Sequence, residues 1–181
     1  SRRRITIAKR LKEVQTETVM TTTYNEVDLS SVIAIRKKYQ DQFVKKHNTK
    51  LGFMSFFVKA SVNSLQSFPH LNAELHQDEL IVKKYYDIGI AVATDEGLVV
   101  PVLRGADSLS SAEIELGIAE LATKSREKKI TLQELQGGTF SITNGGVFGS
   151  LMSTPLLNPP QVGILGMHKI MEKPLAVDGE I

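Results

Sequence analysis

The sequence predicts an α/β protein of the α+β kind, a two-layer sandwich in which helices cover a mixed sheet. Segments with helical spacing and runs rich in β-branched residues are interspersed, without the regular strand–helix–strand order that builds an all-parallel sheet. The chain has 181 residues, 41% of them hydrophobic, and it contains neither a repeat nor a linker-like stretch. A chain of this size can bury one core, so we expect a single domain over residues 1–181.

The first third of the chain predicts three helices and one strand. Apolar residues recur at helical spacing in residues 5–18, opposite a basic face. Residues 20–28 (MTTTYNEVD) are β-branched and aromatic, which predicts a strand. Two serines can cap a second helix over residues 30–47, in which Val32, Ile35, Tyr39 and Phe43 share a face. A third helix over residues 53–68 is apolar enough to be largely buried.

The middle of the chain predicts two hairpins. Two β-like runs flank the polar pair at 77–78, and residues 87–94 and 98–103 flank the turn-forming DEG at 95–97. Both runs of the second hairpin are strongly apolar, so we expect them to be central strands of the sheet.

The remaining elements follow from capping and turn signals. Ser110 and Glu113 form a capping-box pair that opens a helix to about residue 128. A strand over 162–167 follows a proline-rich loop. Asp178 and Gly179 after an apolar run indicate a type I′ hairpin turn. Strands usually have about 5–6 residues and only two remain after this turn, so we expect a C-terminal segment to be missing.

Composition excludes several classes of function. There is no Cys, which excludes a disulfide framework, a thiolate metal site and a covalent acyl-cysteine, and which favours an intracellular compartment. The four histidines are scattered without metal-ligand spacing, so we expect no metal. Net charge is only +2, nucleic-acid-binding motifs are missing, and no apolar stretch nears the ~20 residues that span a bilayer. We therefore expect neither a nucleic-acid nor a membrane partner.

The stretch FSITNGGVFGS at residues 140–150 is the best candidate for a site. In a strand, Ser141 and Thr143 would share one polar face, and a hydroxyl aimed from that face could stabilise an oxyanion. An ordinary half-buried strand followed by a turn explains the same pattern. The glycines match neither of the common phosphate-loop motifs, which makes nucleotide binding the weaker alternative. His168, after an apolar strand, is the best candidate base by position, although a histidine there is more often structural.

Four stretches together resemble a known family over residues 4–181. LGFMSFFVKA, GLVVPV, SITNGGVFGSLMSTP and NPPQVGILGMH are similar to the catalytic domain of dihydrolipoamide acyltransferases, the core component of 2-oxo-acid dehydrogenase complexes. The NGGVFGS and FMSF motifs most resemble the succinyltransferase branch of the family, which serves the 2-oxoglutarate dehydrogenase complex. The resemblance implies a chloramphenicol-acetyltransferase-like fold and trimers with active-site channels between subunits. It also implies that the trimers join into a cube of twenty-four chains.

The resemblance also implies an activity. A histidine takes the proton of the CoA thiol, and the thiolate attacks the succinyl thioester of dihydrolipoyllysine directly. The lipoyl group belongs to a separate domain, CoA is a substrate, and no cofactor is bound in this domain. The implied partners are the 2-oxo-acid decarboxylase and dihydrolipoamide dehydrogenase components, in the bacterial cytoplasm or the mitochondrial matrix. The alternatives are acetyl or branched-chain transfer and an inactive structural core.

Site residues can be carried over one by one. Thr143 matches the hydroxyl that binds the tetrahedral oxyanion, and Arg4 matches an arginine that steadies the site. The candidate substrate-binding residues are Asn144, Gly145, Ser150 and Ser153. The family's His-x-x-x-Asp-Gly motif, which supplies the base, does not occur in the sequence. We therefore expect residues 1–181 alone to be an inactive, C-terminally incomplete acyltransferase domain that forms trimers at most.

Overall fold

A mixed four-stranded sheet forms the centre of the molecule. The computed structural model describes the backbone of residues 2–180 and the side chains of residues 4–180. The strand order is β6 (Val102–Leu103), β3 (Ile88–Ile90), β7 (Phe140–Asn144) and β8 (Ile164–Met167). β3, β7 and β8 run parallel, whereas β6 pairs with β3 antiparallel. The predicted mixed sheet is therefore confirmed.

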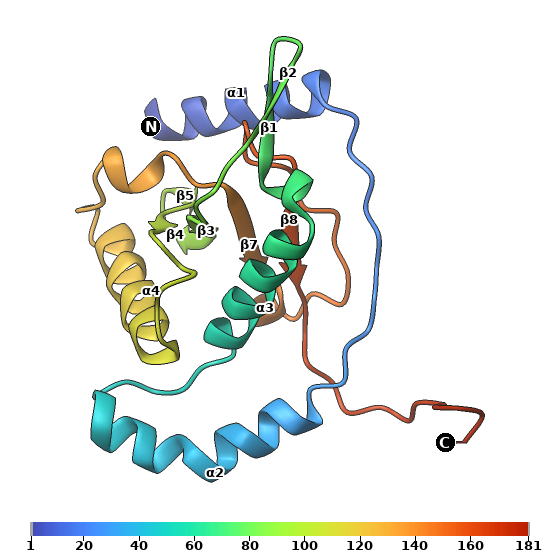
Figure 1. Ribbon diagram of the computed structural model, residues 1–181. Coiled ribbons are helices and arrows are strands. Elements are labelled where there is room, and N and C mark those ends of the chain that lie inside the picture. The colour runs from blue at the N-terminus through green and yellow to red at the C-terminus, as the bar shows by residue number, and fades with distance from the viewer. Residues whose placement is uncertain (1, 181) are drawn as a thin grey trace.

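Helices α3 (Met54–Ser67) and α4 (Ser111–Arg126) form the second layer and enclose the core with the sheet (Figure 1). Val58, Ile114 and Ile142 are completely buried in this core. α3 is less buried than its composition predicts, because only one of its faces is turned inward. The predicted capping box of α4 is confirmed: Ser110 Oγ accepts from the Glu113 amide at 3.3 Å, and Glu113 Oε2 accepts from the Ser110 amide at 2.7 Å.

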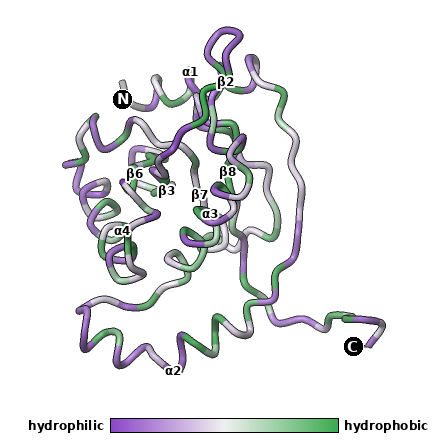
Figure 2. The backbone as a smooth tube through the Cα atoms, in the orientation of Figure 1, coloured by the Kyte–Doolittle hydropathy of each residue, from purple (hydrophilic) through white to green (hydrophobic). Residues whose placement is uncertain are grey.

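Helices α1 (Arg2–Glu17) and α2 (Ser30–His47) lie outside these two layers, at opposite ends of the molecule (Figure 1). Both were expected from helical spacing. α2 has no fully buried residue, and hydrophobic and hydrophilic residues alternate along it (Figure 2). It contacts the body through Arg36, whose Nε donates to the Leu51 carbonyl at 2.9 Å and whose guanidinium lies 3.9 Å from the Phe53 ring centre.

Two small hairpins flank the main sheet. β1 (Ala73–His76) and β2 (Glu79–Val82) form the first hairpin, as predicted. In the second, β4 (Val92–Thr94) pairs with β5 (Gly97–Val99), but neither strand joins the main sheet. The expected long central strands are thus each broken into two. Pro101 contributes to the break because proline has no amide hydrogen to donate to a strand ladder. β3 is central and β6 lies at the edge.

The strand expected at residues 20–28 was predicted wrongly. This segment is extended and runs along the outside of the molecule without a ladder partner among the described residues (Figure 1). Val27 is 70% exposed. β-branched residues favour a pleated and half-buried surface, and a strand forms only where a neighbouring strand supplies one.

The other short elements are three 3₁₀ turns and the C-terminal hairpin turn. The 3₁₀ turns are η1 (Pro69–Asn72), η2 (Gln133–Leu135) and η3 (Gly146–Phe148). Val177 bridges Glu180, and Asp178 and Gly179 both have positive φ, 52° and 86°. The predicted type I′ turn is therefore confirmed.

Candidate active site on the outer face of β7

Strand β7 carries alternating apolar and hydroxyl side chains, as the sequence predicts. Ile142 is fully buried in the core between the sheet and the helices. Because side chains alternate along a strand, Ser141 and Thr143 lie on the opposite face. Thr143 pairs with Gly166 of β8, so no side chain stands beside it on that neighbour. The Thr143 side chain is half-buried on this face of β7.

The loop after β7 folds back onto the end of β8. Asn144 Oδ1 accepts from the Gly146 amide at 2.9 Å, and the Gly145 amide donates to the Met167 carbonyl at 2.9 Å. The Ser150 amide donates to the Gly145 carbonyl at 3.2 Å. These bonds hold the loop in one shape next to Thr143.

Gly146 is required by a close backbone contact. A Cβ atom at this position would lie 2.5 Å from the His168 carbonyl oxygen and 2.9 Å from the Lys169 nitrogen. The sequence suggested that the glycines let the chain turn beside a ligand channel. At Gly146 the close neighbour is the chain that follows β8, which explains this glycine without a bound phosphate.

Ser153 and His168 form a hydrogen-bonded pair near the end of β8. Ser153 Oγ lies 2.8 Å from His168 Nε2. A Cβ placed on Gly166, the ladder partner of Thr143, would lie 2.9 Å from Pro155 Cγ and 3.5 Å from His168 Cε1, so the proline ring and the imidazole both cover that glycine. Ser150 is held at the same end, because its carbonyl accepts from the Lys169 amide at 2.9 Å. Of the predicted site residues, Ser153 contacts the imidazole directly, Ser150 is bonded to the residue after His168, and Thr143 is the ladder partner of Gly166.

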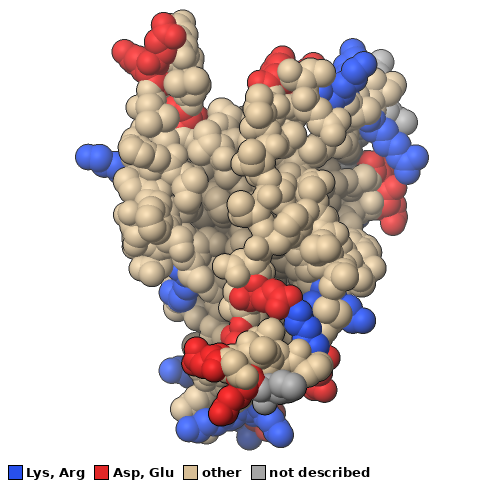
Figure 3. Space-filling model, turned by 90° about the vertical axis from the view of Figure 1, so that its right-hand side faces the viewer, with Lys and Arg blue, Asp and Glu red and all other residues tan. Residues whose placement is uncertain are grey.

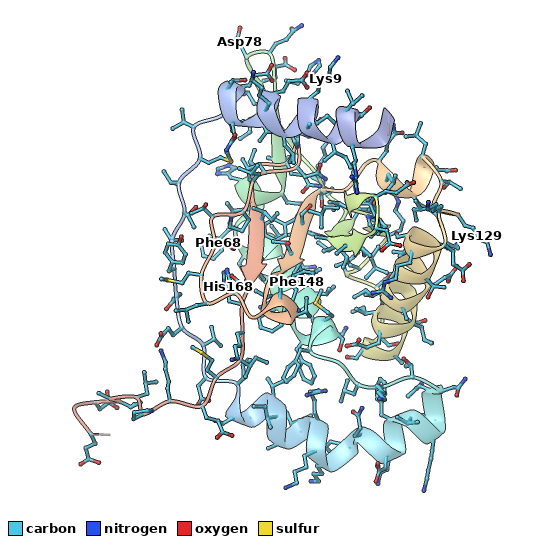
Figure 4. The ribbon with its side chains drawn as sticks, turned by 180° about the vertical axis from the view of Figure 1, so that it is seen from behind. Lys9, Phe68, Asp78, Lys129, Phe148 and His168 are labelled. Carbon is cyan, nitrogen blue, oxygen red and sulfur yellow. The ribbon has the colours of Figure 1, made fainter. Side chains whose placement is uncertain are left out.

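The sequence did not predict the pairing of His168 with Ser153. The signal available was positional: His168 directly follows an apolar run that becomes β8, the parallel neighbour of β7. Parallel neighbours end at the same edge of a sheet, so residues that follow them come together. Figure 4 shows His168 and Phe148 near each other in the middle part of the molecule, between α1 and α2.

Arg4 lies away from this edge. Its Nη2 donates to the carbonyl of Asp95, in the turn between β4 and β5, at 3.1 Å. Lys9 of the same helix stands at the top of the molecule in Figure 4, above Phe148 and His168. The structure thus places Arg4 at the β4–β5 turn, outside the main sheet that carries Thr143.

Thr143 does not line the larger hollow of the chain. A hollow of about 320 Å³ lies elsewhere, lined by Ala93, Thr94, Asp95 and Arg126. Among the described residues, no group of three or more His, Cys, Asp or Glu could hold a metal ion. No described helix is both long and apolar enough to cross a membrane. The chemistry available at the site is hydrogen-bond donation from hydroxyls and an imidazole, which suits an oxyanion or a carboxylate.

Comparison with known proteins identifies close relatives. The chain is 66% identical over 180 residues to a dihydrolipoyllysine-residue succinyltransferase component of a 2-oxoglutarate dehydrogenase complex from Bacillus subtilis, covering 99% of this chain and 43% of that protein. The Rickettsia typhi protein of the same name is 57% identical over 181 residues, covering 100% of this chain and 46% of that protein. The chain thus spans less than half the length of these curated relatives.

Solved structures confirm the fold expected from the resemblance. A dihydrolipoamide acetyltransferase of Azotobacter vinelandii, studied for the catalytic roles of a serine, a histidine and an asparagine, superposes with a TM-score of 0.95 at 33% identity. The cubic core of a pyruvate dehydrogenase multienzyme complex also gives 0.95, at 34% identity. Each match covers 99% of this chain and 74% of the other. Since the sequence model of the family matches residues 1–181, the chain belongs to the 2-oxoacid dehydrogenases acyltransferase (catalytic domain) family.

Proposed function

We propose that this chain is the catalytic domain of a dihydrolipoyllysine-residue succinyltransferase, the core acyltransferase of a 2-oxoglutarate dehydrogenase complex. The observation that carries the proposal is the 66% identity over 99% of the chain to the Bacillus subtilis protein of that name. The acetyltransferase structures that share the fold are 33–34% identical. This difference favours succinyl over acetyl transfer.

The proposed reaction is direct transfer between two thiols. The CoA sulfur forms a bond to the thioester carbonyl carbon, giving a tetrahedral intermediate whose oxyanion accepts a hydrogen bond from the Thr143 hydroxyl. The bond to the dihydrolipoyl sulfur then breaks, and the proton from the CoA thiol ends on that sulfur. No Cys is available in the sequence for an acyl-enzyme, which supports direct transfer. We assign the proton relay to the family's His-x-x-x-Asp-Gly histidine, which these 181 residues do not contain.

The Ser153–His168 pair is the proposed ligand of the succinyl carboxylate. An unpaired carboxylate in a closed site costs several kcal/mol, so donors must meet it. Ser153 Oγ and His168 Nε2 are 2.8 Å apart, on the same face as Thr143, and a hydroxyl and an imidazole N–H can both donate to one carboxylate. Ser150 is the third proposed member of this group, and in this structure its hydroxyl donates to the Met152 carbonyl at 3.1 Å. Asn144 and Gly145 are assigned to the shape of the loop, because their hydrogen bonds close it.

We also propose that the site is completed by another copy of the chain, in a trimer that joins the family's cube. In one chain Arg4 lies at the β4–β5 turn and Thr143 on the main sheet, and a channel between two copies would bring Arg4 of one copy to Thr143 of the next. Figure 3 shows a face with charged side chains at its top and bottom and few across its middle, which suits self-association. The proposed partners are the decarboxylase and dihydrolipoamide dehydrogenase components. The lipoyl group is proposed to lie on a separate domain, and the proposed location is the bacterial cytoplasm or the mitochondrial matrix.

The test is to mix the full-length protein with S-succinyl-dihydrolipoamide and CoA and to follow succinyl-CoA by mass spectrometry. Steady production of succinyl-CoA supports the proposal. An assembled protein that forms none would instead be the inactive structural core that the sequence left open.

A further inference from the structure

A buried hydrogen bond joins β7 to the turn before β8, on the face that carries Thr143. Ser141 Oγ donates to Gln161 Oε1 at 2.6 Å. The two side chains are only 1% and 6% exposed, so water does not compete for this bond. Ser141 precedes Thr143 by two positions and therefore shares its face of the strand.

Two glycines make the space for this pair. Gly89 is the β3 partner of Ser141, and a Cβ on it would lie 2.7 Å from Ser141 Oγ. A Cβ on Gly138 would lie 2.9 Å from Gln161 Nε2. Two separate segments thus leave room for one polar contact where a sheet face would ordinarily hold apolar side chains.

The pair connects the two halves of the site. Gln161 ends the loop that begins at Ser150 and carries Ser153, and its amide closes the last turn by donating to the Asn158 carbonyl at 3.0 Å. The other end of the loop is fixed by the bond from the Lys169 amide to the Ser150 carbonyl. The bond from Ser141 to Gln161 therefore ties the far end of the carboxylate-binding loop to the strand that carries the oxyanion donor.

We infer that Ser141 and Gln161 form a positioning pair, which sets the Thr143 hydroxyl relative to the Ser153 loop without touching the substrate. This inference rests on the proposed function. Its reason is geometric: a displacement of about 1 Å at a reacting group can cost up to about 10²-fold in rate. Without the pair, the Thr143 hydroxyl would still be present but would be less well aligned with the thioester carbonyl. We therefore expect kcat to fall while KM for CoA changes little.

The test is a double-mutant cycle in the full-length protein, with Ser141→Ala, Gln161→Met and the double variant. Each single variant is expected to lower kcat about tenfold, and the double variant to lose no more than either single one, because both remove the same bond. Ser125→Ala is the matched control. Ser125 is also 1% exposed and donates to a backbone carbonyl at 2.7 Å, but it lies in α4, so its loss should lower the melting temperature and leave kcat unchanged.

A second readout does not depend on activity. The methyl resonance of Thr143 is expected to shift in Ser141→Ala and in Gln161→Met and to stay in place in Ser125→Ala. An unchanged resonance together with wild-type kcat in both variants would overturn the inference. Additive losses of kcat in the double variant would also overturn it. A wild-type protein without succinyl transfer would instead overturn the proposed function, and the methyl resonance would still decide whether the pair positions Thr143.

Discussion

The Thr143 hydroxyl is the group on which the proposed chemistry most depends. Its place on the strand follows from local periodicity alone, since Ile142 occupies the core and strand side chains alternate. The Ser153–His168 contact could not be found in this way. The two residues are 15 positions apart, and an irregular loop decides where Ser153 lies.

Thr143→Ala should lower kcat by about 10²–10³ in the full-length protein, because it removes a donor whose partner charge exists only in the tetrahedral state. KM for CoA should change little, and Thr143→Ser should keep most of the activity. Steady-state kinetics with thermal melting checks this. A Thr143→Ala protein that melts early without a specific loss of rate would identify residues 140–146 as an ordinary strand and turn.

His168→Gln should lower kcat/KM for succinyl-dihydrolipoamide more than for acetyl-dihydrolipoamide. The reason is that only the succinyl group carries a carboxylate for the Ser153–His168 pair, and Ser153→Ala should act in the same direction. Competition between the two acyl donors measures the ratio. An equal and large loss with both donors would instead identify His168 as the base of the reaction.

At the scale of elements, periodic segments were predictable and pairing was not. All four helices and the capping box of α4 could be predicted, because their signals are local. The segment at 20–28 has the composition of a strand, but a strand needs a neighbour, and no local pattern states where that neighbour lies. For the same reason, the sequence did not predict that the apolar runs around residues 91 and 100 break into separate sheets.

Glu134, in the turn at η2, should make the free energy of unfolding depend on pH. Glu134 accepts from the Thr131 amide at 2.9 Å, from the Thr131 hydroxyl at 2.8 Å and from Lys124 at 2.9 Å. The Thr131 amide first, and then the Lys124 ammonium and the Thr131 hydroxyl, lower the pKa of Glu134 from 4.5 to about 2. Because the pKa is lower in the folded state, this stabilisation is present above pH 4.5 and is lost as the pH falls towards 2.

Denaturant unfolding of Glu134→Gln across this range measures the effect. The variant should be less stable than the wild type at neutral pH, and the difference should shrink as the pH falls from 4.5 towards 2. Glu120→Gln is the control, because Glu120 also pairs with Lys124 but its side chain is 66% exposed, and exposed ion pairs contribute little. If the difference in free energy of unfolding between the wild type and Glu134→Gln stayed constant with pH, it would contradict the lowered pKa of Glu134 in the folded state.

At the scale of the whole molecule, large apolar side chains remain uncovered in one chain. Ile35 and Tyr39 of α2 are 42% and 43% exposed, and Phe148 beside the site is 74% exposed. The sequence predicted that Ile35 and Tyr39 share an apolar face with Val32 and Phe43. In the structure the less exposed residues are instead Val32, Arg36, Gln40, Phe43 and His47, because the helix rests on the body through Arg36.

These exposed residues predict that the 181-residue chain self-associates. Analytical ultracentrifugation should give three times the 20.0 kDa of one chain, since burying such side chains stabilises association. A species that stays monomeric at micromolar concentration would contradict the shared-site arrangement. A stable cube of twenty-four would contradict the expectation, drawn from the family resemblance, of trimers at most.

The central claim is that this site transfers succinyl groups to CoA and recognises them by their carboxylate. The ratio of kcat/KM for succinyl-dihydrolipoamide to that for acetyl-dihydrolipoamide, measured with the full-length protein and CoA, tests it most directly. An acetyl group would leave the hydrogen-bond donors of the carboxylate site unpaired, and sites of this kind discriminate strongly between substrates. We therefore predict a preference for succinyl of at least about 10²-fold. A ratio near one, or a preference for acetyl, would contradict it.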